Sequence, residues 1–502
     1  MIFEIVLHKR IVGCLFCLFS MGLMGQTTLV SNQAGLSQHK SQYRKALGQV
    51  GGGVFSMYSG GVDYSHGFVL ERYSEELVFE ADRKVEAQSK HIVLRVACTD
   101  SFVFWLSVVK SKRMTYKFFH HRLGLDLQGD IASREIATIS GIEVDVRTFE
   151  TTMSTDKKAV GIFGFVQGVG NQGLKTSSAL ALSVDVRGKL MDSFSTVIVR
   201  DLGVDDVAWA SAEVSGNGNL ALIYKDNFYG NALFNQRKDV SHFHFIHRRN
   251  FLTHHGSIEL SGTVMDANVV MHANGEDFEI WGYWSELKSQ GIHGHFRGEI
   301  ETLIGGKDSL AIEQFDWNDR DFKQLSGLMA IKKSSKPENY FIRDVIGLSH
   351  GGRLLISEQF YESRQMETYY VNGVPQTSSK LFFHYGDIAL QYLGKDGALD
   401  SVVMIRKTQV GSSAMLHLFG FAHYVCAGSL NLVYNDDEGE INRVVHVKID
   451  NNFVVQRDWL FRSDNIPGSI VPYEGGETDY CTLTLPIYRD KQWHWLQVIS
   501  ND

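Results

Sequence analysis

The first 336 residues of this 502-residue chain contain no proline. Average usage of about 5% would place roughly 17 prolines there, so the deficit excludes proline-rich linkers, collagen-like repeats and polyproline stalks. All five prolines lie at or beyond Pro337. A chain that makes its turns from Gly, Asn and Asp, and keeps its backbone N–H donors, is suited to long antiparallel ladders.

Short apolar runs dominate the rest of the pattern. From Val54 onward, runs rich in Val, Ile, Phe, Tyr and Leu alternate with clusters of Gly, Asn and Asp, which is typical of strands joined by hairpins. Turn signals such as SGNGN at 215–219 and Asp396-Gly397 lie between the runs. We expect strands at runs such as 91–98, 102–109, 220–226, 278–284 and 430–436. The sequence therefore predicts an all-β chain.

A weak internal repeat groups these strands. The segments SVDVRGKL at 183–190, LGKDGAL at 393–399 and VKIDNNFVV at 447–455 each join apolar strands through a tight turn that contains Asp with Gly or Asn. Dividing residues 53–499 into four-stranded units predicts a β-propeller of about seven four-stranded antiparallel blades of roughly 64 residues. We expect blades to begin near His91, Val144, Val207, Val269, Tyr340 and Ser413.

We expect N- and C-terminal strands to close this array. In this interpretation the strands at 470–499 complete a blade that residues 53–84 begin, which removes an exposed edge. Two or three separate β-sandwiches are the alternative, which length alone favours. The composition is evenly proline-free and rich in turn residues from 54 to 336, so no linker is indicated there. Residues 327–340 are the one plausible domain boundary. The sequence thus predicts a single β-propeller domain over 53–502.

The residues before that domain indicate export. Residues 1–25 place His8, Lys9 and Arg10 before an apolar run at 11–24, the layout of a secretory signal peptide. That run is too short to span a membrane, and we expect no transmembrane segment elsewhere. Residues 26–52 are predicted to be a polar lead-in segment. We therefore expect a protein of the periplasm, the cell surface or the extracellular space.

Charge and cysteine content narrow the class of protein further. The formal net charge of -8 comes without a basic stripe, so we expect no nucleic-acid partner. Three cysteines follow the signal segment, which allows at most one disulfide. We interpret Cys98 and Cys426 as small buried apolar side chains. A bridge between Cys426 and Cys481 is the alternative.

Two glycine-containing segments match the residue spacing of known cofactor-binding or catalytic motifs. Residues 168–173 fit the dinucleotide fingerprint, but a strand rather than a helix is predicted after them, and the pyrophosphate needs a helix N-terminus. Residues 347–351 fit the esterase nucleophile elbow, yet the sequence that follows alternates like a strand. We interpret both as hairpin loops and expect no cofactor. A carboxylate pair from distant blades would leave no signal in sequence spacing.

Histidines give the one candidate metal pattern. Alternate histidines on a strand share one face, and two such strands can build a zinc or copper site. The weak candidates are His242, His244, His293 and His295. The alternative, which we favour, is the wetter face of a sheet in which His alternates with Phe. We therefore predict no metal.

An ordered series of short motifs runs through residues 140–500. The motifs are STDK at 154–157, GYWS at 282–285 with 291–296, GRLLISEQFY at 352–361, YGDI at 385–388, Asp396-Gly397, KTQ at 407–409 and YND at 434–436. In this order they resemble a group of secreted, uncharacterised β-propeller-like proteins of Bacteroidetes. The chain departs from the group at His293 and His295, and at Asp437 and Glu438 after the last motif. The resemblance implies an exported propeller and supplies no activity.

With no intact catalytic constellation, the sequence favours a non-catalytic binding or scaffold protein. Its expected partner is a protein or glycan of the cell envelope, bound by a monomer. The candidate binding residues, expected between the last two complete blades, are Asp387, Lys407, Gln409, Asn435 and Asp436. The alternative is an exported hydrolase or lyase that acts on a carbohydrate or lactone at the propeller channel.

Overall fold

The computed structural model describes residues 27–30, 43–60, 67–86, 91–112, 115–140, 142–144, 149–169, 175–200, 207–227, 241–249, 251–272, 277–286, 291–302, 308–318, 320–321, 337–371, 374–436, 443–460, 468–479, 481–489 and 492–500. The predicted signal peptide at 1–25 lies outside them. Among the described helical segments, none has the length and apolar character that crossing a membrane requires.

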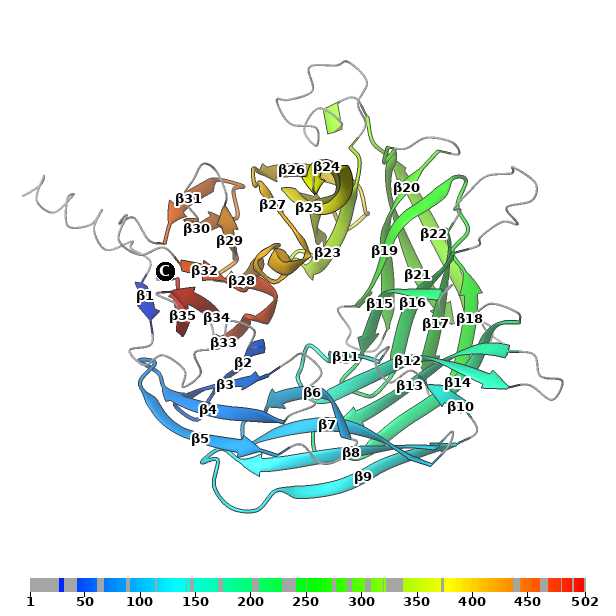
Figure 1. The fold of residues 1–502 in the computed structure, drawn as a ribbon. Helices are drawn as coiled ribbons and strands as arrows, with labels where there is room; N and C mark the ends of the chain where they lie inside the picture. Colours follow the sequence, from blue (N-terminus) through cyan, green and yellow to red (C-terminus); the bar gives the residue numbers. More distant parts are fainter. Residues whose placement is uncertain are drawn as a thin grey trace, which may run out of the picture. The chain divides into compact units, whose positions relative to one another are not determined.

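The strands of the described residues form eight antiparallel sheets (Figure 1). In seven of them the strands follow one another along the chain. The first four of these contain β2 (Tyr43–Val50), β3 (Gly53–Ser59), β4 (Phe68–Ser74) and β5 (Phe79–Val85); β6 (His91–Cys98), β7 (Phe102–Lys112), β8 (Thr115–Gly124) and β9 (Ala132–Ser140); β10 (Ile142–Val144), β11 (Glu150–Met153), β12 (Ala159–Val169), β13 (Lys175–Asp185) and β14 (Leu190–Arg200); and β15 (Val207–Val214), β16 (Leu220–Asn227), β17 (Ser241–Arg249) and β18 (Leu252–Ser257).

The remaining sheets follow the same plan. They contain β19 (Thr263–Met271), β20 (Phe278–Ser285), β21 (Gly294–Thr302) and β22 (Asp308–Asp316); β23 (Tyr340–Gly347), β24 (Arg353–Val371), β25 (Val374–Leu393), β26 (Leu399–Ile405) and β27 (Gln409–Gly411); β28 (Ala422–Cys426), β29 (Ser429–Asp436), β30 (Arg443–Ile449) and β31 (Val455–Trp459); and β1 (Thr27–Val30) with β32 (Gly468–Ile470), β33 (Gly476–Asp479), β34 (Thr482–Arg489) and β35 (Gln492–Ile499). Two short 3-10 helices, η5 (Ser413–Leu418) and η6 (Pro472–Glu474), lie between strands.

Repetition of a four-stranded antiparallel meander defines the β-propeller class, so the predicted fold class is confirmed. The described residues hold eight sheets, one more than the predicted count of about seven. Three predicted starts, at His91, Val207 and Tyr340, are the first residues of β6, β15 and β23. The start predicted near Ser413 falls in η5, ahead of β28.

The ends of the described chain share a sheet, but through a different strand from the one predicted. β1 pairs with β35, with Thr27 opposite Ile499. Residues 53–84 instead supply β3, β4 and most of β5, and form their own sheet with β2. The segment at 26–52, predicted to be a polar lead-in, therefore contains two strands. It contributes to two sheets, which accounts for the extra sheet.

One turn recurs between the strands, as the repeat predicted. At the β13–β14 hairpin the N–H of Gly188 donates to the carbonyl of Asp185 at 2.9 Å, and Gly188 has a φ of 87°. A side chain is strained at that φ, so glycine suits the position. Asp185 Oδ1 also accepts the N–H of Lys189 at 2.7 Å. The same backbone bond with a positive φ recurs at Gly218, Gly351 and Gly397.

The chain divides into two compact units. The middle unit consists of residues 63–65 and 87–413, and the terminal unit of 1–62, 66–86 and 414–502. In the middle unit, consecutive sheets pack face to face through apolar side chains, as where Phe118 and Leu180 share a core cluster. In the terminal unit, Val433 and Leu485 do the same for the β28–β31 sheet and the sheet of β34.

Four first strands of the middle unit carry a β-bulge at an equivalent place. The extra residues are Leu94 in β6, Ala210 in β15, Met265 in β19 and Arg343 in β23. A polar residue follows each bulge, and Arg95, Ser211 and Asp266 each form a hydrogen bond to a strand of the next sheet. The bonds are Arg95 Nη1 to the Thr151 carbonyl at 3.0 Å, the Val269 N–H to Ser211 Oγ at 3.2 Å, and the Ile342 N–H to Asp266 Oδ2 at 2.7 Å. The sequence pattern did not indicate these bulges.

The cysteines correct the favoured interpretation. Cys426 and Cys481 form a disulfide, which joins β28 to the start of β34 within the terminal unit. Both side chains are buried, so the predicted burial of Cys426 is correct, although Cys426 also forms the disulfide. Cys98 is buried, as predicted, and takes no part in a disulfide.

Candidate functional site

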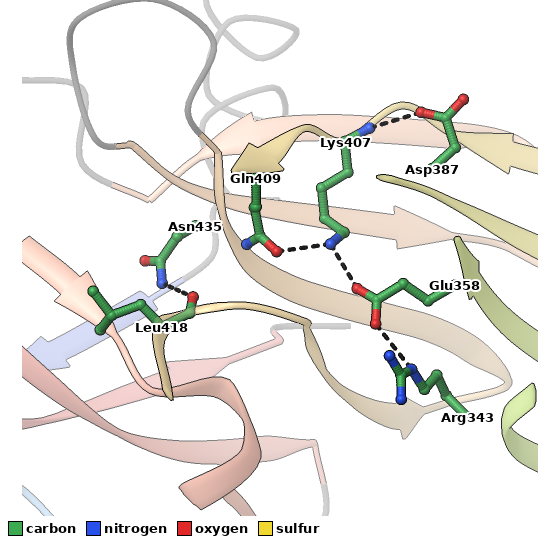
Figure 2. A network of polar contacts seen from close by, with 7 residues as sticks. All are labelled: Arg343, Glu358, Asp387, Lys407, Gln409, Leu418 and Asn435. Atoms are coloured by element: carbon green, nitrogen blue, oxygen red, sulfur yellow. Dashed lines mark hydrogen bonds and ion pairs between the residues drawn. The ribbon is translucent and has the colours of Figure 1, made fainter. Parts of the chain in front are cut away.

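Three of the five predicted binding residues belong to one polar network of the middle unit. Lys407 Nζ lies 2.6 Å from Glu358 Oε1 and 2.8 Å from Gln409 Oε1 (Figure 2). Arg343 Nε donates to Glu358 Oε2 at 2.9 Å. Glu358 therefore receives one cation on each carboxylate oxygen, and Figure 2 shows its side chain between Lys407 and Arg343.

Asp387 holds the backbone end of this network. Its Oδ1 accepts the N–H of Lys407 at 3.2 Å, and its Oδ2 pairs with Arg406 Nη1 at 3.1 Å. The Tyr385 ring lies beneath the cations, with its centroid 5.6 Å from Lys407 Nζ. The strand β25, which carries Asp387 and Tyr385, thus fixes the segment that leaves β26.

Burial decides what this network can do. The Lys407 and Glu358 side chains are both 0% exposed, so each charge needs the other to offset its lost hydration. Gln409 is buried as well. These contacts give Lys407 and Gln409 a structural part in the β23–β27 sheet, and their part in ligand binding stays a prediction.

The other two predicted residues lie in the terminal unit, in a separate set of contacts. Asn435 Nδ2 donates to the carbonyls of Leu418 and Ile470, at 2.7 and 2.8 Å, and its Oδ1 accepts the Ile470 N–H at 2.9 Å. This side chain ties β29 to β32. Asp436 pairs with Arg457. Both asparagine and aspartate are buried, and their binding role also stays a prediction.

The histidine candidates have protein partners rather than a shared site. His295 is buried, its Nε2 lies 2.8 Å from the Gly397 carbonyl, and its Nδ1 accepts the Trp317 indole N–H at 3.0 Å. Burial lowers the pKa of His295 to about 4. His293 Nε2 lies 2.8 Å from Glu286 Oε2. These bonds use both nitrogens of His295, so it offers no lone pair to a metal.

His244 belongs to a different sheet from His293 and His295. It stacks on Tyr224 on β16, and its Nδ1 lies 3.1 Å from Ser257 Oγ. The His242 side chain lies outside the described residues. Within the part of the chain that the structure describes, no three His, Cys, Asp or Glu side chains are grouped to hold a metal ion.

Two carboxyl groups that sequence analysis missed lie on bulged first strands. Burial raises the pKa of Asp266 to about 6, against the hydrogen bonds from the Ile342 and Ala267 N–H groups. Burial, with the charge of Asp344, raises the pKa of Glu213 to about 8. The signal that could have found them is a polar residue inside an apolar first strand, as in VMDAN at 264–268 and WASAE at 209–213.

The buried carboxylate of Glu279 has the opposite environment. Burial would raise the pKa of Glu279, but the hydrogen bond from Trp281 Nε1 at 2.9 Å and the charge of Arg353 outweigh it and hold that pKa below its usual value. Arg353 Nε lies 3.1 Å from Glu279 Oε2 and comes from the next sheet. This ion pair joins the two sheets and offers no free base for catalysis.

The long hairpin of β24 and β25 extends beyond the other strands of its sheet. Its strands have 19 and 20 residues, whereas β23 and β26 have eight and seven. The neighbouring strands pair only with its base, so residues 361–371 and 374–382 form a two-stranded ribbon, which we call the arm. Met366 and Tyr370 on the arm are 69% and 72% exposed.

The register places apolar side chains on one face of the arm. Directly opposed residues share a face, and Met366 lies opposite Ser379, Tyr370 opposite Pro375, and Arg364 opposite Leu381. Met366 and Tyr370 are four residues apart, so they project on that same side. The arm was not among the predicted features, although Asn372-Gly373 between Val371 and Val374 is a strong hairpin signal.

Comparisons with known proteins add no family. No family model matches the sequence, and no curated protein matches it. Similar solved structures include Chaetomium thermophilum Sqt1 (9% identity, TM-score 0.38, 91% of this chain and 95% of that one), the WD40 domain of SCAP from fission yeast (7%, 0.35, 95% and 98%) and the Dos1 propeller (9%, 0.34, 81% and 94%). Likeness at this level says nothing of function, and the strand order carries the fold assignment.

Proposed function

We propose that this protein is an exported β-propeller that works as a non-catalytic binding or scaffold protein of the cell envelope. It acts as a monomer in the periplasm, at the cell surface or outside the cell. The Cys426–Cys481 disulfide supports an oxidising compartment. The signal pattern at 1–25 and the resemblance to secreted Bacteroidetes proteins support the same address.

The arm is the observation that carries the proposal. A two-stranded ribbon is marginally stable in water without further strands or a covering surface. This one also exposes Met366 and Tyr370 on one face. A partner protein that covers that face removes apolar area from water, which favours association. A protein partner suits the face better than a glycan, because Met366 and Tyr370 add exposed apolar area that protein side chains can cover.

The test compares the proteins that bind to wild type with those that bind to a variant whose arm lacks its two exposed apolar side chains. Tagged wild-type protein and the double variant Met366→Ser with Tyr370→Ser are isolated from the producing cells after chemical cross-linking. The control is Val454→Ser, since Val454 is 52% exposed on the terminal unit. We expect a discrete partner with wild type and control, and its loss with the double variant. The same yield from all three would contradict the role of the arm.

The second candidate is a hydrolase or lyase that acts on a carbohydrate or lactone. Glu213 favours it, because a carboxyl group with a pKa raised to about 8 beside the charged Asp344 resembles a general acid. Wild type and Glu213→Gln are assayed on polysaccharides and lactones. Turnover that the variant loses would support the enzyme and overturn the non-catalytic proposal.

A further inference from the structure

A groove of about 680 Å³ lies between the outer strands of two neighbouring sheets of the middle unit. One wall comes from β17, β18 and the residues after β18, and the other from β22. Its volume is in the range of sites that hold a ligand. The lining residues that matter here are Phe245, Leu252, His254, Glu259, Leu310 and Ile312.

Both walls end in a strand edge. β18 is the last strand of its sheet and β22 the last of its own, so no described strand pairs with their outer edges. The N–H and C=O groups along such an edge can bind an extended segment by adding a strand to the sheet. The groove therefore offers backbone hydrogen bonds as well as side chains.

The floor of the groove is apolar and has the spacing of a strand. Leu310 and Ile312 are two residues apart on β22 and face the neighbouring sheet. On the other wall, a Cβ on Gly256 would lie 2.6 Å from the Phe245 ring, so the absence of a side chain leaves that ring room to form the floor. Side chains on one face of an extended peptide recur at the same period of two.

The lip of the groove exposes large apolar side chains. Phe251 and Leu252, at the β17–β18 hairpin, are 69% and 59% exposed. Phe251 has a φ of 65°, a left-handed conformation that a bulky residue seldom adopts. Phe251 lies in the two-residue turn between Arg249 and Leu252, a turn type that requires this conformation. The two exposed side chains thus place apolar area at this end of the groove.

Charge indicates which peptide would fit. Glu259 is the one acidic residue among the described lining residues, and it forms no ion pair within the described part of the chain. Two arginines near the lip are neutralised, because Arg248 Nε lies 2.9 Å from Asp192 Oδ2 and Arg249 pairs with Asp277. An exposed carboxylate without a cation favours a basic ligand.

We propose that this groove binds an extended segment of a partner protein that carries apolar side chains at alternate positions and one basic side chain. The segment adds to a free strand edge, its apolar side chains cover Leu252, Leu310 and Ile312, and its basic side chain pairs with Glu259. The inference rests on the proposed binding function and adds a second contact surface, with a stated partner chemistry, to that of the arm.

The test uses short fluorescent peptides that alternate valine or leucine with threonine. One set ends in lysine and the matched set ends in glutamate. Fluorescence anisotropy with the full-length protein should give saturable binding, about tenfold tighter for the lysine set. Glu259→Lys should reverse that preference, and Leu252→Asp should weaken both sets. Val454→Asp, which changes an exposed apolar residue of the terminal unit, should match wild type.

Three results would overturn the inference. They are no saturable binding by wild type, equal binding of the two peptide sets, and binding that Leu252→Asp leaves unchanged. Sedimentation of wild type and Leu252→Asp tests whether a second copy of this protein occupies the groove instead. A wild-type dimer that becomes a monomer in Leu252→Asp would show that it does. Circular dichroism confirms that each variant is folded.

Experiments on the arm distinguish a failure of the groove inference from a failure of the proposed function. The double variant Met366→Ser with Tyr370→Ser should bind the lysine peptides as wild type does. If the peptides fail to bind while the arm still holds its partner, the groove inference falls and the proposed function stands. If the arm holds no partner while the peptides bind, the groove inference stands and the role of the arm falls.

Discussion

The Lys407 ammonium lies 2.6 Å from Glu358 Oε1, and neither side chain is exposed to water. The pair joins the segment after β26 to β24. A buried pair is weak evidence of net stabilisation, because desolvation offsets much of the attraction. Removal of Lys407 is different, because the buried Oε1 of Glu358 then loses its cation and only Arg343, 2.9 Å from Oε2, remains.

Lys407→Met should therefore lower the free energy of unfolding by about 3 kcal/mol. Lys407→Met combined with Glu358→Leu should recover most of that loss, because no buried carboxylate then remains without its lysine. Urea unfolding followed by fluorescence measures both. A single variant as stable as wild type would mean that Lys407 does not neutralise Glu358.

Glu213 should make the stability of the protein fall with rising pH. Burial and the charge of Asp344 raise its pKa from 4.5 to about 8 in the folded state, so the folded state binds the extra proton. Its favourable contribution is complete below about pH 4.5 and is lost as the pH rises to about 8. Glu213→Gln should match wild type at pH 5 and exceed it by at least about 1 kcal/mol at pH 9.

Thermal unfolding across that pH range checks the Glu213 prediction. The control is Glu259→Gln, which makes the same substitution at an exposed glutamate of the same unit. A wild-type profile that Glu213→Gln reproduces at every pH would show that Glu213 is charged in the folded protein.

The Cys426–Cys481 disulfide closes a loop across a sequence separation of 55. Loop-closure entropy gives such a bridge a contribution of about 4 kcal/mol. Cys426→Ser with Cys481→Ser should lower the melting temperature, and reducing agent should do the same to wild type but not to the variant. Cys98→Ala should keep the response to reducing agent. A wild-type melting temperature that ignores reductant would contradict the bridge.

Gly282 should tolerate no side chain. A Cβ there would collide with the Phe296 ring and with the Asp266 carbonyl oxygen at the β19 bulge. Gly282→Ala should lower the free energy of unfolding by more than about 1 kcal/mol. Gly60→Ala is the matched control, because nothing lies within 4 Å of its Cβ position. Equal denaturation midpoints for the two variants would show that the β19–β22 sheet has room for a side chain at Gly282.

The local features of the fold were predictable because each is encoded within a few residues. Asp185 and Gly188 form one hairpin turn whose chemistry is visible in the sequence. Blade starts at His91, Val207 and Tyr340 followed from the same turn spacing. The motif order also named Lys407 and Gln409, and placed Glu358 in a neighbouring motif, without indicating that these side chains touch.

Long-range features were not predictable, because sequence spacing does not encode them. The β1–β35 pair joins residues from opposite ends of the chain. The bulges that place Asp266 and Ser211 against the next sheet depend on packing between sheets. The pKa of Glu213 depends on burial and on Asp344, which lies on β23. Each requires the strands to be assembled first.

The central claim is that the apolar face of the arm contacts a partner protein. The most direct measurement places a photo-reactive amino acid at Tyr370 in the producing cells and identifies what it captures, with the same amino acid at Val454 as the control. The account predicts one discrete protein adduct at position 370 and none at 454. No adduct at 370, or the same adducts at both positions, would contradict it.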